Sequence, residues 1–66
     1  MKNRIRVARA EVRMTQQQLA EAIGVSRQTI NAIESGKFVP STVLALKMAQ
    51  IFEKPVEDIF MLDDED

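Results

Sequence analysis

The sequence contains no cysteine and no histidine, and it has only two glycines and two prolines among 66 residues. Without cysteine, no disulfide can stabilise the fold, and without histidine as well, a zinc site of the usual kind is not expected. A domain of this length buries only about 60% of the surface that its unfolded chain exposes, so its stability is marginal. The remaining means of stabilisation are regular helix packing and a partner subunit.

The same absences argue against catalysis. Histidine is the most common general base of enzymes and cysteine is a strong nucleophile, and neither is present. There is no glycine-rich phosphate-binding loop, and many of the carboxylates gather in residues 63–66, where burial cannot tune a pKa. We therefore expect a protein that is not an enzyme, with no metal, no cofactor and no evident small-molecule ligand.

Long apolar runs are also missing. No stretch approaches the roughly 18 apolar residues of a membrane span, and the charged N-terminus is not followed by the apolar segment of a signal peptide. We expect residues 1–66 to form a single cytoplasmic domain with no membrane partner.

The net charge of −1 conceals an uneven distribution. Residues 1–38 carry seven Lys and Arg and three Glu, a net +4, whereas residues 39–66 carry two Lys and seven Asp and Glu, a net −5. Such a split is typical of a half that binds a polyanion beside an acidic tail, although two ordinary solvated faces would give the same count. Residues 63–66 are all acidic and are predicted to form a disordered, solubilising tail.

The spacing of apolar residues predicts an all-α fold of short helices. Ile5, Ala8 and Val12 recur at helical intervals and predict a first helix over residues 3–13, with Val7 off this stripe. Further helices are predicted over residues 15–23, 26–35, 42–52 and 56–60, which gives a compact five-helix bundle. Residues 61–62 are expected to extend and to pair with the first few residues in a short two-stranded ribbon.

Residues 15–36 carry the most informative pattern. Thr15 and Gln18 have the spacing of a capping box at a helix start, and Gly24 suits the left-handed conformation that ends the helix. A second helix follows after Ser26, so two short helices meet at a turn of three to four residues. This is the helix-turn-helix arrangement, in which the second helix enters the DNA major groove.

The residues around this turn fit the arrangement physically. Ala20 is small where the two helices cross, and Val25 and Ile30 fill the angle between them. The second helix exposes side chains that suit base edges: Arg pairs with guanine, Gln and Asn pair with adenine, and Ala contacts the thymine methyl group. These exposed residues include no acidic group and are Ser26, Arg27, Gln28, Asn31 and Ala32.

From about residue 3 to residue 60, the chain resembles the phage-repressor/Cro (Xre) family of helix-turn-helix proteins. The resemblance is carried by Arg9 and by residues 14–20, 23–30, 33–36, 40–41 and 55–60. It implies a lambda-repressor-like bundle with base contacts from Ser26, Arg27, Gln28 and Asn31. It also implies phosphate contacts from Gln16, Gln17, Thr29 and Lys37, and a partly buried salt bridge between Arg9 and Glu34.

The expected function is sequence-specific binding of double-stranded DNA by a transcriptional regulator, a repressor, at an inverted-repeat operator. Residues 42–52 are apolar most of the way around the helix, so they must be covered on more than one side. We expect a homodimer whose interface contains Val39, Pro40, Leu44, Pro55, Val56, Phe60 and Leu62. An antitoxin, or another protein-interaction module, is the alternative that uses the same fold.

Overall fold

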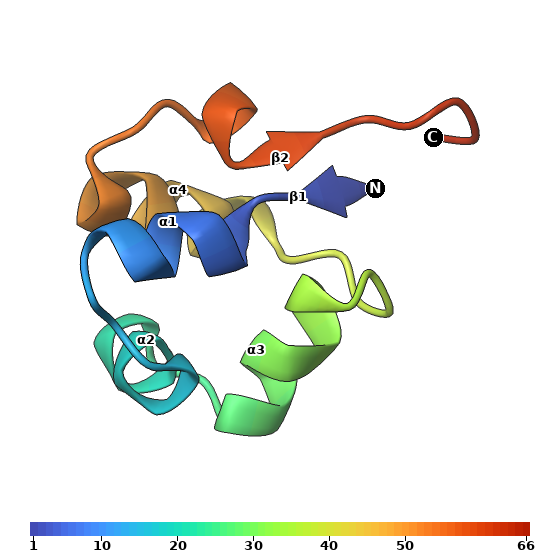
Figure 1. The fold of residues 1–66 in the computed structure, drawn as a ribbon. Helices are drawn as coiled ribbons and strands as arrows, with labels where there is room; N and C mark the ends of the chain where they lie inside the picture. The colour runs from blue at the N-terminus through green and yellow to red at the C-terminus, as the bar shows by residue number, and fades with distance from the viewer.

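The computed structural model describes all 66 residues. Their elements follow in the order β1 (Lys2–Asn3), α1 (Ile5–Glu11), α2 (Gln16–Ile23), α3 (Arg27–Glu34), α4 (Thr42–Phe52), a 3-10 turn η1 (Val56–Asp58) and β2 (Phe60–Met61). In Figure 1, the ribbon of β1 and β2 lies on the side of the molecule away from α2 and the N-terminal end of α3. None of the helices has the length and apolar character needed to cross a membrane.

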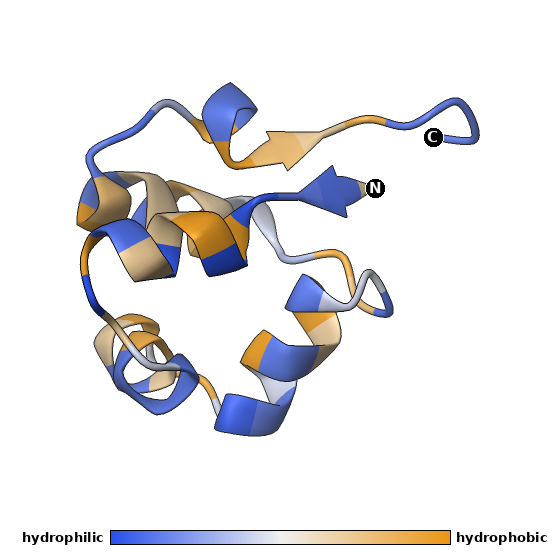
Figure 2. Cartoon of the chain, viewed as in Figure 1, coloured by the Kyte–Doolittle hydropathy of each residue, from blue (hydrophilic) through white to orange (hydrophobic).

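A single apolar core joins the elements. Eleven residues are buried, all of them apolar, and they come from the four helices, Ile59 and β2. Figure 2 shows apolar stretches along the helices and β2, while the tail and the tip of α3 are hydrophilic. In α4, Met48 and Phe52 are buried, while Leu44 and Ile51 pack against the core from its edge. The apolar surface that was predicted to extend most of the way around this helix is therefore partly covered within one subunit.

The predicted starts of three helices are confirmed. Thr15 Oγ1 accepts the Gln18 N–H at 3.0 Å, and Gln18 Oε1 accepts the Thr15 N–H at 2.9 Å, which completes the capping box. Ser26 and Ser41 cap α3 and α4 in the same way through their side-chain oxygens. Gly24 has φ +79°, the left-handed conformation that ends α2.

The first helix is shorter than predicted. It begins at Ile5 rather than residue 3, because Asn3 belongs to β1 and its Oδ1 accepts the Ile5 N–H at 3.2 Å. The helix ends at Glu11, and Arg13 turns the chain with φ +56°. Val12, the last residue of the predicted apolar stripe, is exposed beyond the helix end.

The predicted fifth helix over residues 56–60 is wrong, and the fold has four α-helices. Only Val56–Asp58 is helical, as one 3-10 turn closed by the Asp58 and Ile59 N–H groups. Beyond it, Ile59 O accepts the Arg4 N–H at 2.7 Å and Phe60 pairs with Asn3, so the chain extends instead of coiling. The predicted ribbon is confirmed as an antiparallel pair, but it ends at Met61 and leaves Leu62 outside.

The two termini meet at the end of this ribbon. The α-amino group of Met1 lies 3.3 Å from Asp63 Oδ2 and 3.2 Å from Asp66 Oδ2. The hydrogen bonds that the amino group donates to the carboxylates of Asp66 and then Asp63 raise its pKa. The bonds that Asp66 accepts from the Asp63 N–H and from the amino group lower the pKa of Asp66. Residues 63–66 thus form a turn in the structure, and their disorder in solution stays a prediction.

Candidate nucleic-acid interface

The pair α2 and α3 is held at a fixed angle by its turn. Ala20 is fully buried at the crossing, and its carbonyl accepts the N–H groups of both Gly24 and Val25, at 2.9 and 3.0 Å. Ile30 is also fully buried, and Val25 packs against the same core. Because these contacts leave little freedom between the two helices, the outer face of α3 has a defined orientation.

The first turn of α3 presents two exposed polar side chains. Ser26 Oγ accepts the Thr29 N–H at 3.1 Å and lies 3.0 Å from Thr29 Oγ1, so these two predicted contact residues bond to each other. Arg27 and Gln28 come directly after the cap and are exposed. Unlike Ser26 and Thr29, their side chains make no hydrogen bond within the protein, so their polar groups are available to a ligand.

Four of the predicted contact residues meet around one polar hollow between the helices. The hollow measures about 190 Å³ and is lined by Gln16, Arg27, Gln28 and Asn31, with no apolar side chain. A neighbouring, more open hollow of about 400 Å³ brings Gln17 to the same face, together with Arg13. Arg13 could not be predicted as a contact residue from the sequence, because its position in the bend after α1 depends on how the chain folds.

Arg9 and Glu34 form a bidentate ion pair beneath this face. Arg9 Nε lies 2.7 Å from Glu34 Oε2, and Arg9 Nη2 lies 3.1 Å from Oε1. The Glu34 side chain is only 2% exposed, and Arg9 also donates to the Met14 carbonyl at 3.0 Å. The pair therefore ties α1 and the bend before α2 to the end of α3.

Glu34 also orients two of the contact residues. Its Oε1 accepts a hydrogen bond from Gln16 Nε2 at 3.2 Å, and the same nitrogen lies 3.4 Å from Asn31 Oδ1. An ionised carboxylate only accepts hydrogen bonds, so the nitrogen of the Gln16 amide must face Glu34. Asn31 Oδ1 faces that nitrogen in turn, which leaves the Asn31 N–H groups for another partner.

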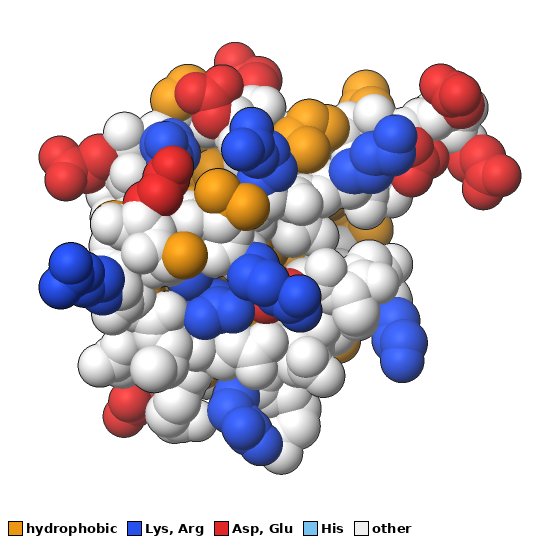
Figure 3. Space-filling view, in the orientation of Figure 1, with side chains coloured by type: hydrophobic (Ala, Val, Ile, Leu, Met, Phe, Trp, Pro, Cys, Tyr) orange, Lys and Arg blue, Asp and Glu red, His pale blue; other side chains and the backbone are white.

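The surface charge is uneven around this site. In Figure 3, Lys and Arg side chains lie over α1, at the bend that follows it and at the N-terminal tip of α3, whereas most Asp and Glu side chains lie at the top and along the tail. Lys37, predicted to contact phosphate, is exposed just after α3. Its N–H bonds to the Ala32 carbonyl at 2.9 Å, which holds its backbone against the end of the helix.

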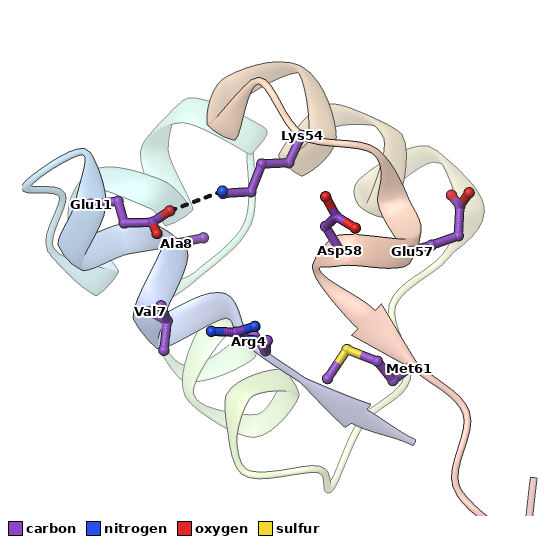
Figure 4. Close-up of a pocket in the computed structure, with 8 residues that line it drawn as sticks. All are labelled: Arg4, Val7, Ala8, Glu11, Lys54, Glu57, Asp58 and Met61. Carbon is purple, nitrogen blue, oxygen red and sulfur yellow. Dashed lines mark ion pairs between the residues drawn. The ribbon is translucent and has the colours of Figure 1, made fainter.

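A further hollow of about 320 Å³ lies away from this site, between α1, η1 and β2 (Figure 4). Lys54 Nζ and Glu11 Oε1 form an ion pair of 3.1 Å across it. Arg4, Glu57 and Asp58 also line the hollow. Because both signs of charge are present, its lining favours neither an anion nor a cation.

The residues predicted for a dimer interface are partly brought together. Val39, Pro40, Val56 and Phe60 line one largely apolar groove of about 280 Å³, which also includes Leu46. The other three predicted residues, Leu44, Pro55 and Leu62, do not line it. Phe60 is mostly buried in the core, whereas Val39 is 60% exposed.

Comparison with known proteins gives the family of this fold. Residues 5–59 match the sequence model of the helix-turn-helix family. The chain belongs to the helix-turn-helix family. This agrees with the resemblance to the phage-repressor/Cro (Xre) proteins that the residues carry.

Two relatives are similar over nearly their full length. An uncharacterized HTH-type transcriptional regulator of Methanocaldococcus jannaschii is 50% identical over 66 residues, covering 100% of both chains. One of Bacillus subtilis is 46% identical over 65 residues, covering 98% of both. These relatives of the helix-turn-helix family are thus as small as this chain.

Two solved structures share the fold. A candidate DNA-binding protein of Bacteroides fragilis has a TM-score of 0.79 and 34% identity, covering 88% of this chain and 94% of its own. The clp gene regulator ClgR of Corynebacterium glutamicum has a TM-score of 0.75 and 30% identity, covering 82% of this chain and 57% of its own. The helix-turn-helix unit therefore occurs both in a chain of similar size and as part of a longer regulator.

Proposed function

We propose that the protein is a transcriptional repressor that binds double-stranded DNA with sequence specificity, with α3 in the major groove. The polar hollow where Gln16, Arg27, Gln28 and Asn31 meet is the observation that carries this proposal. It supports the proposal because Arg27 and Gln28, whose side-chain types suit base edges, are exposed at the tip of α3, where a recognition helix contacts bases. Its lining includes no acidic side chain that would repel the DNA.

The contact residues divide into two kinds in this proposal. Arg27 contacts guanine O6 and N7, and Gln28 contacts adenine N6 and N7, each pair contributing about 1–3 kcal/mol of discrimination. Ser26 and Asn31 contact bases beside them. The remaining contacts hold phosphates and carry no sequence information; they come from Gln16, Gln17, Thr29 and Lys37.

The proposed working species is a homodimer. The apolar groove supports it, because exposed apolar side chains that gather in one place, here around Val39, mark interaction surfaces, whereas scattered ones do not. A two-fold dimer binds an inverted repeat whose half-sites lie about 34 Å apart, or about 10 base pairs.

Selection of bound sites from random DNA duplexes tests this function. We expect the pure protein to enrich an inverted repeat, because base-edge contacts from two symmetry-related helices require matching half-sites. Sequencing of the bound pool after each round measures the enrichment. A pool that stays random would contradict sequence-specific regulation and would favour an antitoxin or another protein-interaction module.

Substitution Val39→Glu tests the dimer. We expect sedimentation equilibrium at micromolar concentration to give twice the 7.5 kDa mass of the chain for the wild type and close to the single mass for the variant. The reason is that dimerisation would bury the introduced charge without a partner.

Val7→Glu is the matched control, because Val7 is 45% exposed on α1, outside the apolar groove. This variant is expected to stay dimeric. A wild-type monomer that still binds its operator would contradict the proposed dimer, and dissociation by Val7→Glu alone would place the interface elsewhere.

A further inference from the structure

We propose that a hollow beside α3, lined by Gln28, Thr29, Ala32 and Phe38, receives the 5-methyl group of a thymine in the bound DNA. The hollow measures about 290 Å³ and opens on the outer side of the helix. This inference rests on the proposed function, and it adds a specificity residue, Phe38, from the loop that follows the recognition helix.

Phe38 is placed against α3 by its backbone. Gly36 has φ +79° and turns the chain back after the helix. The N–H groups of Lys37 and Phe38 then both bond to the Ala32 carbonyl, at 2.9 and 3.2 Å. The phenyl ring is nevertheless 49% exposed, so a large apolar surface lies uncovered beside the predicted base-reading residues.

The lining of the hollow suits an apolar group rather than a phosphate. It contains no charged side chain, and its apolar walls come from Ala32 and Phe38. Thr29 Oγ1 lies 3.0 Å from Ser26 Oγ, so the phosphate contact that we propose for Thr29 would use a hydroxyl whose present partner lies outside the hollow. The thymine methyl is the one apolar group that base edges present in the major groove, and Ala, Thr and Phe are suited to contact it.

The position of the thymine follows from Gln28. This residue lines both the polar hollow at the tip of α3 and the apolar hollow beside Phe38. The contacted thymine should therefore lie next to the base pair that Gln28 reads, towards the C-terminal end of α3. Phe38 does not line the apolar groove that we assign to the second subunit, and it is not among the residues that we propose for the dimer interface.

Replacing single operator thymines with deoxyuridine tests this inference, because uracil pairs as thymine does and lacks only the methyl group. Using the operator obtained by selection, we expect one position in each half-site to lose affinity about fourfold, the equivalent of about 0.8 kcal/mol for one buried methyl group. Phe38→Ala should bind the thymine operator correspondingly less tightly and should no longer distinguish thymine from uracil at that position. Val43→Ala, which shortens an exposed apolar side chain on α4, should keep the full sensitivity.

The outcomes separate this inference from the function on which it rests. If the wild type binds its operator but no replacement of thymine by deoxyuridine weakens binding, the proposed methyl site is wrong, while the proposed function as a regulator is retained. If Phe38→Ala retains the sensitivity, or sediments as a monomer where Val43→Ala is dimeric, Phe38 does not form this site. If no operator is enriched, the proposed function itself fails.

Discussion

Replacing Arg9 with methionine is expected to lower the free energy of unfolding by about 3–5 kcal/mol. The substitution leaves the carboxylate of Glu34, whose side chain is 2% exposed, without its bidentate partner. Arg6 is a poor substitute, because its Nε lies 3.8 Å from Glu34 Oε1, beyond hydrogen-bond distance, on a largely exposed side chain. Small domains are stable by only about 5–15 kcal/mol, so a loss of this size removes a large part of the total.

Urea titration measures this effect, at one protein concentration for all variants because a dimer is stabilised by mass action. Lys54→Met is the matched control, since it breaks an ion pair with a Glu11 side chain that is 51% exposed and should change the stability by at most about 1 kcal/mol. The double variant Arg9→Met/Glu34→Leu should recover much of the loss, because it removes the buried charge as well. Equal unfolding midpoints for Arg9→Met and the wild type would contradict the structural role of the pair.

Replacing Gln28 with alanine is expected to relax base preference at one operator position, symmetrically in both half-sites. The two lost hydrogen bonds to adenine correspond to about 1–3 kcal/mol of discrimination in each half-site. Gln28 is exposed in the first turn of α3, so the substitution should leave the fold intact. Selection from random duplexes, repeated with the variant, measures the preference at every position.

Lys37→Ala is the control for the loss of a contact without sequence information. It should weaken binding to all sequences alike and reduce the salt dependence of affinity by about one unit of slope for each lost phosphate contact. An operator preference that Gln28→Ala leaves unchanged would contradict the assignment of Gln28 to a base.

Features that depend on neighbouring residues were predictable from the sequence. The capping box of Thr15 and Gln18 and the left-handed Gly24 each depend on residues within one turn, and the structure has both. The start of α1 was not predictable in this way, because Asn3 is held by carbonyls of Ile33 and Glu34 at the end of α3. Such contacts, about 30 residues apart in the chain, exist only once the helices have packed.

The error in the last helix has the same origin. Residues 56–60 have a pattern that is compatible with a helix, and Pro55 suits a helix start. The N-terminal segment keeps this stretch extended, because the Arg4 N–H bonds to the Ile59 carbonyl and Asn3 pairs with Phe60. Local preference was overridden by a partner from the other end of the chain.

The candidate site divides in the same manner. The polar face of α3 could be predicted from the sequence. Its cap is a local feature, and its exposed positions recur with the helical period. The bonds from Gln16 to Glu34 and Asn31 depend on the angle between α2 and α3, so the amide orientations emerge only from the structure. Phe38 had no helical pattern to mark it, and its place beside Ala32 depends on the turn at Gly36.

The meeting of the two termini makes this chain suitable for attachment at either end. Both lie by the ribbon, away from the N-terminal tip of α3 (Figure 1). An added domain, a tag or an anchor on a sensor surface would leave from that side, so the tip of α3 would still face the solution. An N-terminal extension would remove the charged amino group that Asp63 and Asp66 contact, whereas an extension after Asp66 would keep it. Immobilising the protein through its C-terminus therefore keeps more of the native contacts between the termini.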